Sequence, residues 1–435
     1  MSENSLHSQI TGAFEEMQSG LNGSAREAFN LRRIDALKSF NSLGFPTPKH
    51  EEWKYSNVKK LVNGNYNFAA GNSLSKETLK SFELPDLEGI IIYFVNGVYQ
   101  ESLSNLALAK GKLSIQTLED AQKNSSELLN QHFSKYSNDS LEAFTAINTA
   151  TASQGIVVKV EDNVTIEHPI ILRMVSDVRE ENIGSTLRNL VVVGKNAEVK
   201  IAESYRTLGE ASAYVNVVTE IVVAKDARVD YYKVENDNNA SYHIGTTNVH
   251  QEDNSYFYAA TITLNGGFVR NNLNLKVDGE HVESWMYGLY IPNDKQHVDN
   301  HTVVDHTKPN SVSNELYKGV LMDRSTVVFN GKIFVRQEAQ KTNAYQNCRN
   351  VVTSDDATMN TKPQLEIWAD DVKCSHGATT GMLNDEAIFY MRSRGIPKEE
   401  AVRMQLLAFA EDVVSQIKIE SVREYLSGLI HQKLG

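Results

Sequence analysis

Residues 187–205 read LRNLVVVGKNAEVKIAESY, two strand-like runs of β-branched residues on either side of a Gly-Lys-Asn turn. The same order of acidic or amide turn, small residue and alternating strand recurs along the chain at a spacing of roughly thirty residues, with one longer gap before Asp323. The repeats are EDNVTIE (161–167), GKNAEVKIAE (194–203), AKDARVDYYK (224–233), EDNSYFYAA (252–260), GEHVESWMYG (279–288), DRSTVVFNG (323–331) and DDATMNT (355–361). Repeats of this size without a helical insert predict a coiled or solenoid β architecture, and a sandwich or propeller also fits the pattern.

Helical patterns flank the repeats. At the amino end, Leu6, Ile10, Phe14, Met17 and Leu21 recur every three or four residues and predict an amphipathic helix. A capping box at Ser24 and Glu27 opens a second helix, which Gly44 and Pro46 end. Residues 121–150 are expected to be helical and polar. We therefore predict a mostly helical (α/β) domain over 1–150 and a β core over 151–381.

The last predicted domain, 382–435, is helical. Asn384 is expected to cap its first helix, which ends near Gly395, and Ser421 with Glu424 forms a second capping box. Between these helices one apolar stripe predicts packing on the β core. The stripe consists of Val402, Leu406, Phe409, Val413 and Ile417.

Composition narrows the class of protein. The chain has 435 residues and a formal net charge of −12, which argues against a nucleic-acid or anionic-membrane partner. Two cysteines fit a reducing cytoplasm rather than a disulfide framework. The first residues lack the basic and apolar regions of a signal peptide, and no apolar run approaches a membrane span. We expect a cytoplasmic protein.

Cys374 and His376 stand two residues apart in a strand-like run, so their side chains should share one face. A thiolate and an imidazole suit iron–sulfur or zinc chemistry. Two ligands cannot hold a metal, so such a site would be completed by another chain; the alternative is a buried thiol and a satisfied imidazole. Cys348, beside Arg349, is interpreted as a structural thiol.

A second cluster of candidate ligands lies in HVDNHTVVDH (297–306). Its histidines His297, His301 and His306, with Asp299 and Asp305, could form a 2-His-1-carboxylate metal site of a hydrolase, and a polar turn ladder is the alternative. Phosphate-loop, dinucleotide-binding, nucleophile-elbow and H-E-x-x-H motifs are absent. The chain thus shows no self-sufficient catalytic set, and we expect that it is not an enzyme.

Five long stretches together resemble the SufB/SufD family of iron–sulfur cluster assembly scaffolds, and within it the SufD branch. They are EEWKYSNV (51–58), HTVVDHTKPNSVSNELYKGVL (301–321), NGKIFVRQEAQKTNAYQNCRN (330–350), TKPQLEIWADDVKCSHGAT (361–379) and FYMRSRGI (389–396). The resemblance implies a right-handed parallel β-helix core between helical ends. It also implies a SufB-like partner subunit and a SufC-like ABC ATPase.

The resemblance assigns roles to individual residues. It implies that His376 contacts a nascent Fe–S cluster shared with the SufB-like subunit, and that Cys374 lies in the same motif without being a required ligand. It places the ATPase-docking surface on the helical tail, at Phe389, Arg392, Arg394 and Gly395. No cofactor is expected to bind this chain stably on its own.

Three alternatives remain beside this interpretation. SufB-like chains are usually longer and richer in cysteine, which favours the SufD branch. A carbohydrate-active β-helix enzyme, usually secreted, is the second, and the metal-dependent hydrolase built on 297–306 is the third. The isolated chain could also form a homodimer, because an exposed β edge is a template for another strand.

Overall fold

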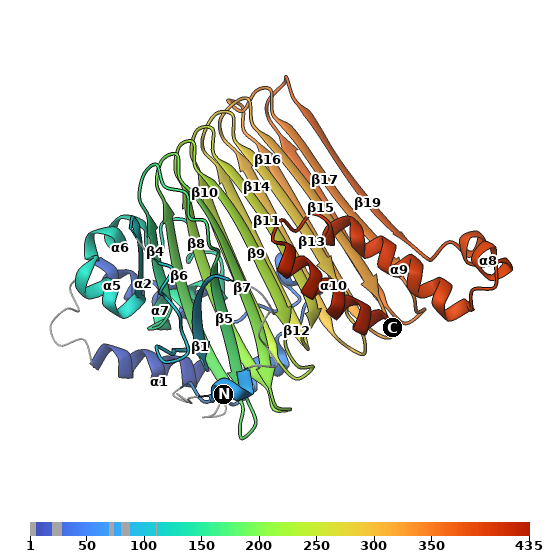
Figure 1. Cartoon of the computed structure of the whole chain (residues 1–435). Helices are drawn as coiled ribbons and strands as arrows, with labels where there is room; N and C mark the ends of the chain where they lie inside the picture. Colours follow the sequence, from blue (N-terminus) through green and yellow to red (C-terminus); the bar gives the residue numbers. More distant parts are fainter. Residues whose placement is uncertain (1–5, 20–27, 69–73, 80–87, 110) are drawn as a thin grey trace.

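The computed structural model describes residues 6–19, 28–68, 74–79, 88–109 and 111–435. Successive strands alternate between two facing sheets, so that the chain winds as a parallel β-helix of stacked coils (Figure 1). The ten-stranded sheet has the order β19 (Lys373–Gly381), β17 (Asn343–Val352), β15 (Val312–Leu321), β13 (Glu283–Tyr290), β11 (Tyr256–Asn265), β9 (Arg228–Asn236), β7 (Glu198–Leu208), β5 (Ile170–Asp177), β1 (Ile90–Val95) and β2 (Val98–Tyr99). The nine-stranded sheet has the order β18 (Thr358–Ile367), β16 (Thr326–Val335), β14 (His297–His306), β12 (Phe268–Val277), β10 (Tyr242–Gln251), β8 (Ala213–Val223), β6 (Ile183–Val193), β4 (Ile156–Val160) and β3 (Leu113–Thr117). The predicted mainly β solenoid is confirmed, and the sandwich and propeller are not.

The turns explain the repeat. At the corners from β4–β5 to β16–β17, where an even-numbered strand leads to the next odd-numbered one, a residue with positive φ reverses the chain, as at Asn196 (52°) and Asn254 (55°). Asparagine and aspartate tolerate this left-handed conformation better than other non-glycine residues. Neighbouring turns also bind each other: Asn196 N donates to Lys225 O at 3.0 Å, and Asn254 N donates to Glu280 O at 2.8 Å. The turns thus stack in register from coil to coil.

The longer gap before Asp323 has a structural cause. The first five sequence repeats lie at this corner, and the same corner continues through Asn310 and Lys341, which the sequence pattern missed. Asp323 instead lies at the opposite corner, between β15 and β16. The last two repeats therefore belong to a second column of turns.

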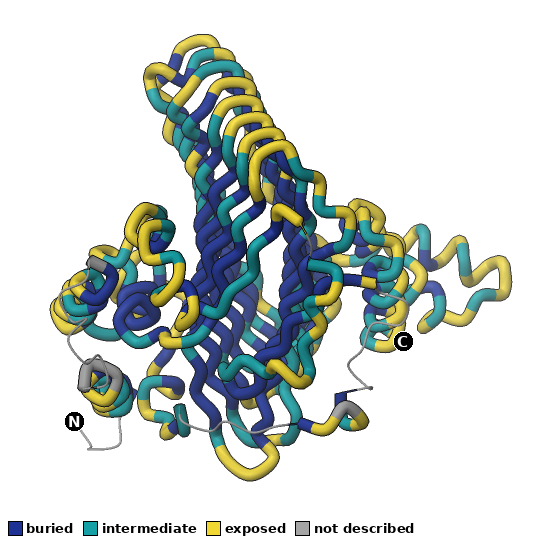
Figure 2. Tube along the Cα trace, turned by 60° about the vertical axis from the view of Figure 1, so that its left-hand side comes forward, coloured by how far each residue is buried: buried dark blue, intermediate teal, exposed yellow. Residues whose placement is uncertain are grey.

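Side chains alternate between the interior and the outer faces of the sheets, and the interior is apolar over much of its length. Figure 2 shows that the strands of the stacked coils are mostly buried. Val215, Val229 and Phe257 belong to this interior cluster and are all nearly inaccessible to solvent. Burial of such side chains stabilises each by about 1.5–3 kcal/mol. Buried polar groups such as Glu235 and Lys233 continue the same inward rows.

Most of the amino-terminal helices cover the outer face of the nine-stranded sheet (Figure 1), where Phe144 and Ile147 pack with Tyr214. The amino-terminal helices are α1 (Leu6–Ser19), α2 (Ala28–Leu43), the 3-10 turn η2 (Glu51–Trp53), α3 (Lys59–Val62), α4 (Lys76–Leu79), α5 (Leu118–Asn124), α6 (Ser126–His132) and α7 (Ala143–Thr151). Leu79 of α4 instead packs with Tyr93 and Val175 of the ten-stranded sheet. The expectation of polar helices over 121–150 is wrong for α7, whose residues 143–150 are all buried because the helix lies between α2 and the sheet. Leu21, Ser24 and Glu27 lie outside the described residues.

The carboxy-terminal helices α8 (Asp385–Ser393), α9 (Lys398–Val414) and α10 (Glu420–Leu434) follow the last strand. As predicted, the stripe of α9 packs on the β core: Leu406 and Val413 contact the outer face of the ten-stranded sheet around Tyr258. The capping box predicted at Ser421 is wrong, because the N-cap of α10 is Ile419, which has no side-chain bond. The boundaries at 150 and 381 stay predictions. No helix within the described ranges is long and apolar enough to cross a membrane.

Candidate functional site

The β-helix ends in two strands that are each paired on one side only. β18 pairs with β16 and β19 with β17, and neither has a further neighbour among the residues that the structure places. Their outer backbone N–H and C=O groups are therefore available to another strand. At the other end, the terminal strands are short and antiparallel: β2, of two residues, pairs with β1, and β3, of five residues, pairs with β4. The β18–β19 end is the open end of the β-helix.

Cys374 and His376 lie on β19 at this open end, opposite Ala344 and Gln346 of β17. They share the interior face of the strand, as the spacing predicts. Cys374 is half-buried against the apolar interior, and burial raises the pKa of its thiol, which disfavours the nucleophilic thiolate. His376 is exposed because no strand follows β19. Of the pair, the imidazole is the more exposed group.

Cys348 is enclosed one coil deeper, next to Ala378 of β19. Its sulfur accepts from Asn350 Nδ2 at 3.3 Å and lies 3.6 Å from Tyr290 Oη. Burial raises the pKa of the thiol to about 11. These contacts fit the interpretation of Cys348 as a structural thiol.

Two buried polar residues behind His376 were not singled out in the sequence. Gln346 Nε2 donates to Glu315 Oε2 at 2.8 Å, and both side chains are inaccessible to solvent. Burial raises the pKa of Glu315 to about 7. Their inward direction follows from the pairing of the strands, which cannot be read from the sequence. The signal that could have indicated them is the alternation of inward and outward residues, counted back from Cys374 and Cys348.

The four residues expected to dock an ATPase lie away from β19, on α8 and just after it. Asn384 caps this helix as predicted, accepting from Ala387 N at 3.1 Å. Of the residues in α8 only Ile388 is buried, and Phe389 is 73% exposed. Arg392 and Arg394 are exposed as well, and Gly395 ends the helix with a φ of 90°. Figure 1 shows α8 projecting from the body beyond β19. An exposed aromatic ring beside two cations suits a protein contact.

The cluster of 297–306 forms a strand, not a turn ladder. Asp299 lies between Arg270 Nη1, 2.7 Å from its Oδ2, and His301 Nε2, 2.9 Å from its Oδ1. Ser56 Oγ donates to the same Oδ2 at 2.5 Å. Burial would raise the pKa of Asp299, but the charges of Arg270 and His301 outweigh burial and hold it well below its usual range. His306 points into the interior and contacts Ser313 at 2.9 Å.

These contacts anchor the segment EEWKYSNV to the β-helix. Arg270 lies 4.1 Å from the centre of the Trp53 ring, and Lys332 Nζ donates to Glu52 Oε1 at 2.5 Å. The hydrogen bond with His301 is the largest effect on Glu52; burial opposes it, Lys332 adds to it, and together they lower the pKa to about 2. The polar residues of 297–306 thus fix the amino-terminal region to the sheet. Within the described ranges, no three His, Cys, Asp or Glu side chains form a metal-binding group.

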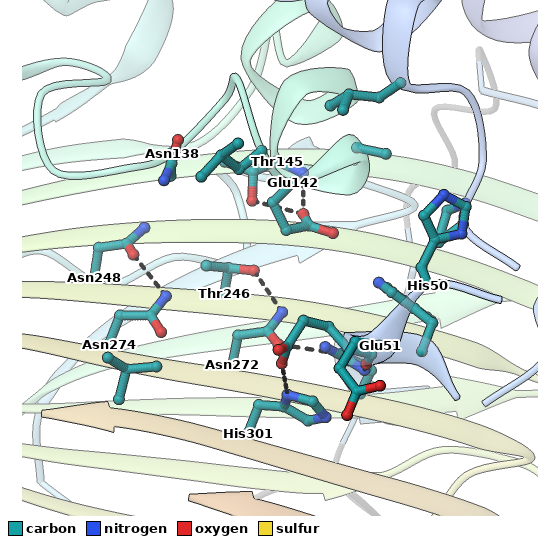
Figure 3. A pocket seen from close by; sticks show the side chains of 18 of the residues that line it. His50, Glu51, Asn138, Glu142, Thr145, Thr246, Asn248, Asn272, Asn274 and His301 are labelled. Atoms are coloured by element: carbon teal, nitrogen blue, oxygen red, sulfur yellow. Dashed lines mark hydrogen bonds and ion pairs between the residues drawn. The ribbon is translucent and has the colours of Figure 1, made fainter. Parts of the chain in front are cut away.

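A cavity of about 370 Å³ adjoins this anchor, between the amino-terminal segments and the nine-stranded sheet (Figure 3). Amides line part of its floor: Asn272 Nδ2 donates to Thr246 Oγ1 at 3.0 Å, and Asn274 Nδ2 donates to Asn248 Oδ1 at 2.9 Å. Glu142 lies on the opposite wall and caps α7 through Thr145 N at 2.6 Å. The amides of the floor thus bind neighbouring side chains, and Arg270 and His301 of the same sheet also line the cavity.

The fold and the open end define a parallel β-helix protein with an unpaired terminal coil. Comparison with known proteins then gives the family. The family model "SUF system FeS cluster assembly, SufBD core domain" matches residues 176–409, and "SufBD protein N-terminal region" matches residues 4–172. The chain belongs to the SufBD family of iron–sulfur cluster assembly proteins.

Individual relatives agree. A SufBD family protein of Synechocystis is 32% identical over 90% of this chain and 88% of its own length. The SufD proteins of Escherichia coli and Bacillus subtilis are 29% and 26% identical, each over 92% of this chain, and over 91% and 93% of their own lengths. The carbohydrate-active enzyme and the metal-dependent hydrolase are therefore set aside in favour of a component of iron–sulfur cluster assembly.

Proposed function

We propose that this chain is the SufD-like subunit of a cytoplasmic cluster assembly complex, pairing with a SufB-like subunit and a SufC-like ATPase. The observation that carries the proposal is the position of His376, exposed on the terminal strand β19, which is paired on one side only. A ligand placed there contributes one bond and needs a second chain for the others. In this arrangement the nascent Fe–S cluster is cargo held between two subunits, and this chain binds no resident cofactor and catalyses no reaction.

Pairing through the open end is supported by the edges of β18 and β19. Each edge can extend its sheet by one strand, and both point out of the same end of the solenoid. An isolated chain with such edges can also pair with a second copy of itself. The SufB-like subunit then competes with a homodimer for one surface.

Docking of the ATPase is supported by α8. Phe389 and Arg392 are exposed on a helix whose only buried side chain is Ile388, and Arg394 is exposed just after it. Because a single side chain of α8 is buried, most of the helix surface is available for contact with a partner. The helices α9 and α10, which pack on the ten-stranded sheet, join this surface to the β core.

The test is co-expression with the SufB-like and SufC-like proteins of the same source, followed by co-purification. We expect Phe389→Asp and Arg392→Glu to lose the ATPase and keep the SufB-like subunit. The matched controls are Leu141→Asp, an apolar residue 75% exposed, and Arg324→Glu, at an exposed turn. Retention of the ATPase by both α8 variants would remove the docking assignment.

The cluster site is tested on the assembled complex. We expect His376→Ala to form the complex but to hold less iron and sulfide after reconstitution. Ser375→Ala is the control, because Ser375 lies on the other face of the same strand. Equal iron and sulfide contents in His376→Ala and wild type would refute the role of His376.

A further inference from the structure

The interior column that ends at His376 consists of paired residues on four successive strands of one sheet. The register aligns Met286 on β13, Glu315 on β15, Gln346 on β17 and His376 on β19. Neighbouring parallel strands lie about 4.8 Å apart, so paired side chains on one face adjoin each other. His376 therefore follows directly after a buried amide and a buried carboxyl group.

The amide of Gln346 has a fixed orientation. Its Nε2 donates to Glu315 Oε2 at 2.8 Å, and a carboxyl oxygen can accept that bond. Gly331 of the facing sheet provides the space, because a Cβ atom at that position would lie 2.2 Å from Gln346 Nε2. The nitrogen of the amide is thereby turned towards Glu315, and its oxygen is left for another donor.

That oxygen has no donor in the described part of the chain. Gln346 Oε1 is buried and makes no hydrogen bond. A buried acceptor without a partner is costly, and most such groups in native proteins are satisfied. On the side of Gln346 away from Glu315, the next residue in the column is His376, which carries a ring N–H in either neutral tautomer. Since His376 is exposed, its side chain can rotate freely.

A histidine that binds a metal usually donates its other ring N–H to an oxygen acceptor, which selects the tautomer and orients the ring. The acceptor next to His376 in its column is the buried oxygen of Gln346, because Gln346 is the residue paired with it. If that bond forms, the second ring nitrogen keeps its lone pair and faces away from Gln346, towards the open end.

We propose that Gln346, held by Glu315, is the positioning residue for His376, and that its Oε1 accepts a ring N–H of His376 so that the other nitrogen is presented to iron. The proposal rests on the proposed function for the identity of the metal. The bond between the two side chains does not, because it can be measured without iron, cluster or partner.

The experiment is nuclear magnetic resonance of the full-length chain labelled with ¹⁵N-histidine, with the His376 signals assigned by their loss in His376→Ala. Ring ¹⁵N shifts report which nitrogen carries the proton. We expect about a fivefold excess of one tautomer in the wild type, and loss of that excess in Gln346→Leu. Glu315→Gln should reduce it in part, because the amide of Gln346 is then less firmly oriented.

Gln251→Leu is the matched control. Gln251 is also a fully buried interior glutamine and accepts from Ser284 Oγ at 2.7 Å, but it lies in the coil of β10, far along the stack from β19. This variant should lose stability and leave the His376 tautomer unchanged. If Gln346→Leu fails to fold, Glu315→Gln against Gln251→Leu carries the comparison. Equal tautomer ratios in the wild type and the folded column variants would overturn the proposal.

Fe²⁺ binding to the complex with the SufB-like subunit distinguishes the positioning role of Gln346 from the role of His376 as an iron ligand. We expect Gln346→Leu to weaken Fe²⁺ binding about 10-fold or more, as loss of an outer-shell acceptor does elsewhere. If the tautomer changes and iron binding does not, Gln346 orients His376 but His376 is no iron ligand, and the proposed function fails alone. If iron binding requires His376 but Gln346→Leu leaves the tautomer ratio of His376 unchanged, the positioning proposal fails and the proposed function does not.

Discussion

Replacement of Arg270 by methionine tests whether a buried ion pair anchors the amino-terminal region. Arg270 and Asp299 are 3% and 1% exposed, and Arg270 also stacks on Trp53 and donates to the backbone oxygen of Glu52 at 2.8 Å. Methionine keeps most of the volume but leaves the Asp299 carboxylate buried without its main counter-charge. Removal of one partner of such a pair costs about 3–5 kcal/mol, and we expect about 4 kcal/mol here.

The assay is urea unfolding followed by tryptophan fluorescence, with limited proteolysis to locate the segment that opens. The double variant Arg270→Met/Asp299→Asn should recover at least about 2 kcal/mol, because no charge is then left buried without a partner. Arg228→Met is the control: Arg228 stacks on Tyr256 at 4.0 Å but is exposed, so its loss should cost under about 1 kcal/mol. A loss below about 1 kcal/mol in Arg270→Met, or no recovery in the double variant, would refute the reasoning.

Three further outcomes follow from buried groups. The pKa of Glu315 is raised from 4.5 to about 7 in the folded chain, so folding takes up a proton between these pH values. The free energy of unfolding should therefore fall by about 3 kcal/mol as pH rises through this window. Glu315→Gln should abolish this pH dependence, measured as the difference between urea midpoints at pH 5 and pH 8. A disulfide reagent should modify Cys374 in the folded chain and Cys348 only after unfolding, and equal rates would contradict their difference in burial. Asp412→Asn should make α9 more sensitive to proteolysis than Lys318→Met does, because the asparagine leaves the buried Lys318 ammonium without the counter-charge that now lies 2.6 Å from it. The reverse order of sensitivity would exclude this ion pair as an anchor of α9.

The repeat and the family motifs predicted the fold well, because period-two alternation and turn chemistry are local properties. The turn residues Asn163, Asn196 and Asp226 each have the positive φ that makes asparagine and aspartate favourable there. The pattern did not separate the two corners of the coil, since both use acidic and amide residues. That separation depends on which strand joins which sheet, a property of the whole solenoid.

The candidate site was predictable only in part. The placement of Cys374 and His376 on one strand face followed from their spacing, while Glu315 and Gln346 became visible through pairing between strands 30 residues apart. The segment 297–306 shows the same limit. Its histidines and carboxylates resembled a metal site in sequence. In the structure the positive charge beside Asp299 is instead the guanidinium of Arg270, which lies on the adjacent strand β12 and donates a hydrogen bond to the carboxylate.

Placing a shared ligand on the last strand has a physical consequence. A residue on an inner coil is enclosed by the strands on both sides, as Cys348 is, and no partner can reach it. On β19 the same inward direction leaves His376 exposed until another chain extends the sheet. Under the proposed function, that added strand would enclose His376 beside Gln346 and would bring the partner's ligands to the same place. Subunit pairing and formation of the cluster site would then be one event, and a chain that pairs only with itself would bring together two copies of His376 without the ligands of a SufB-like subunit.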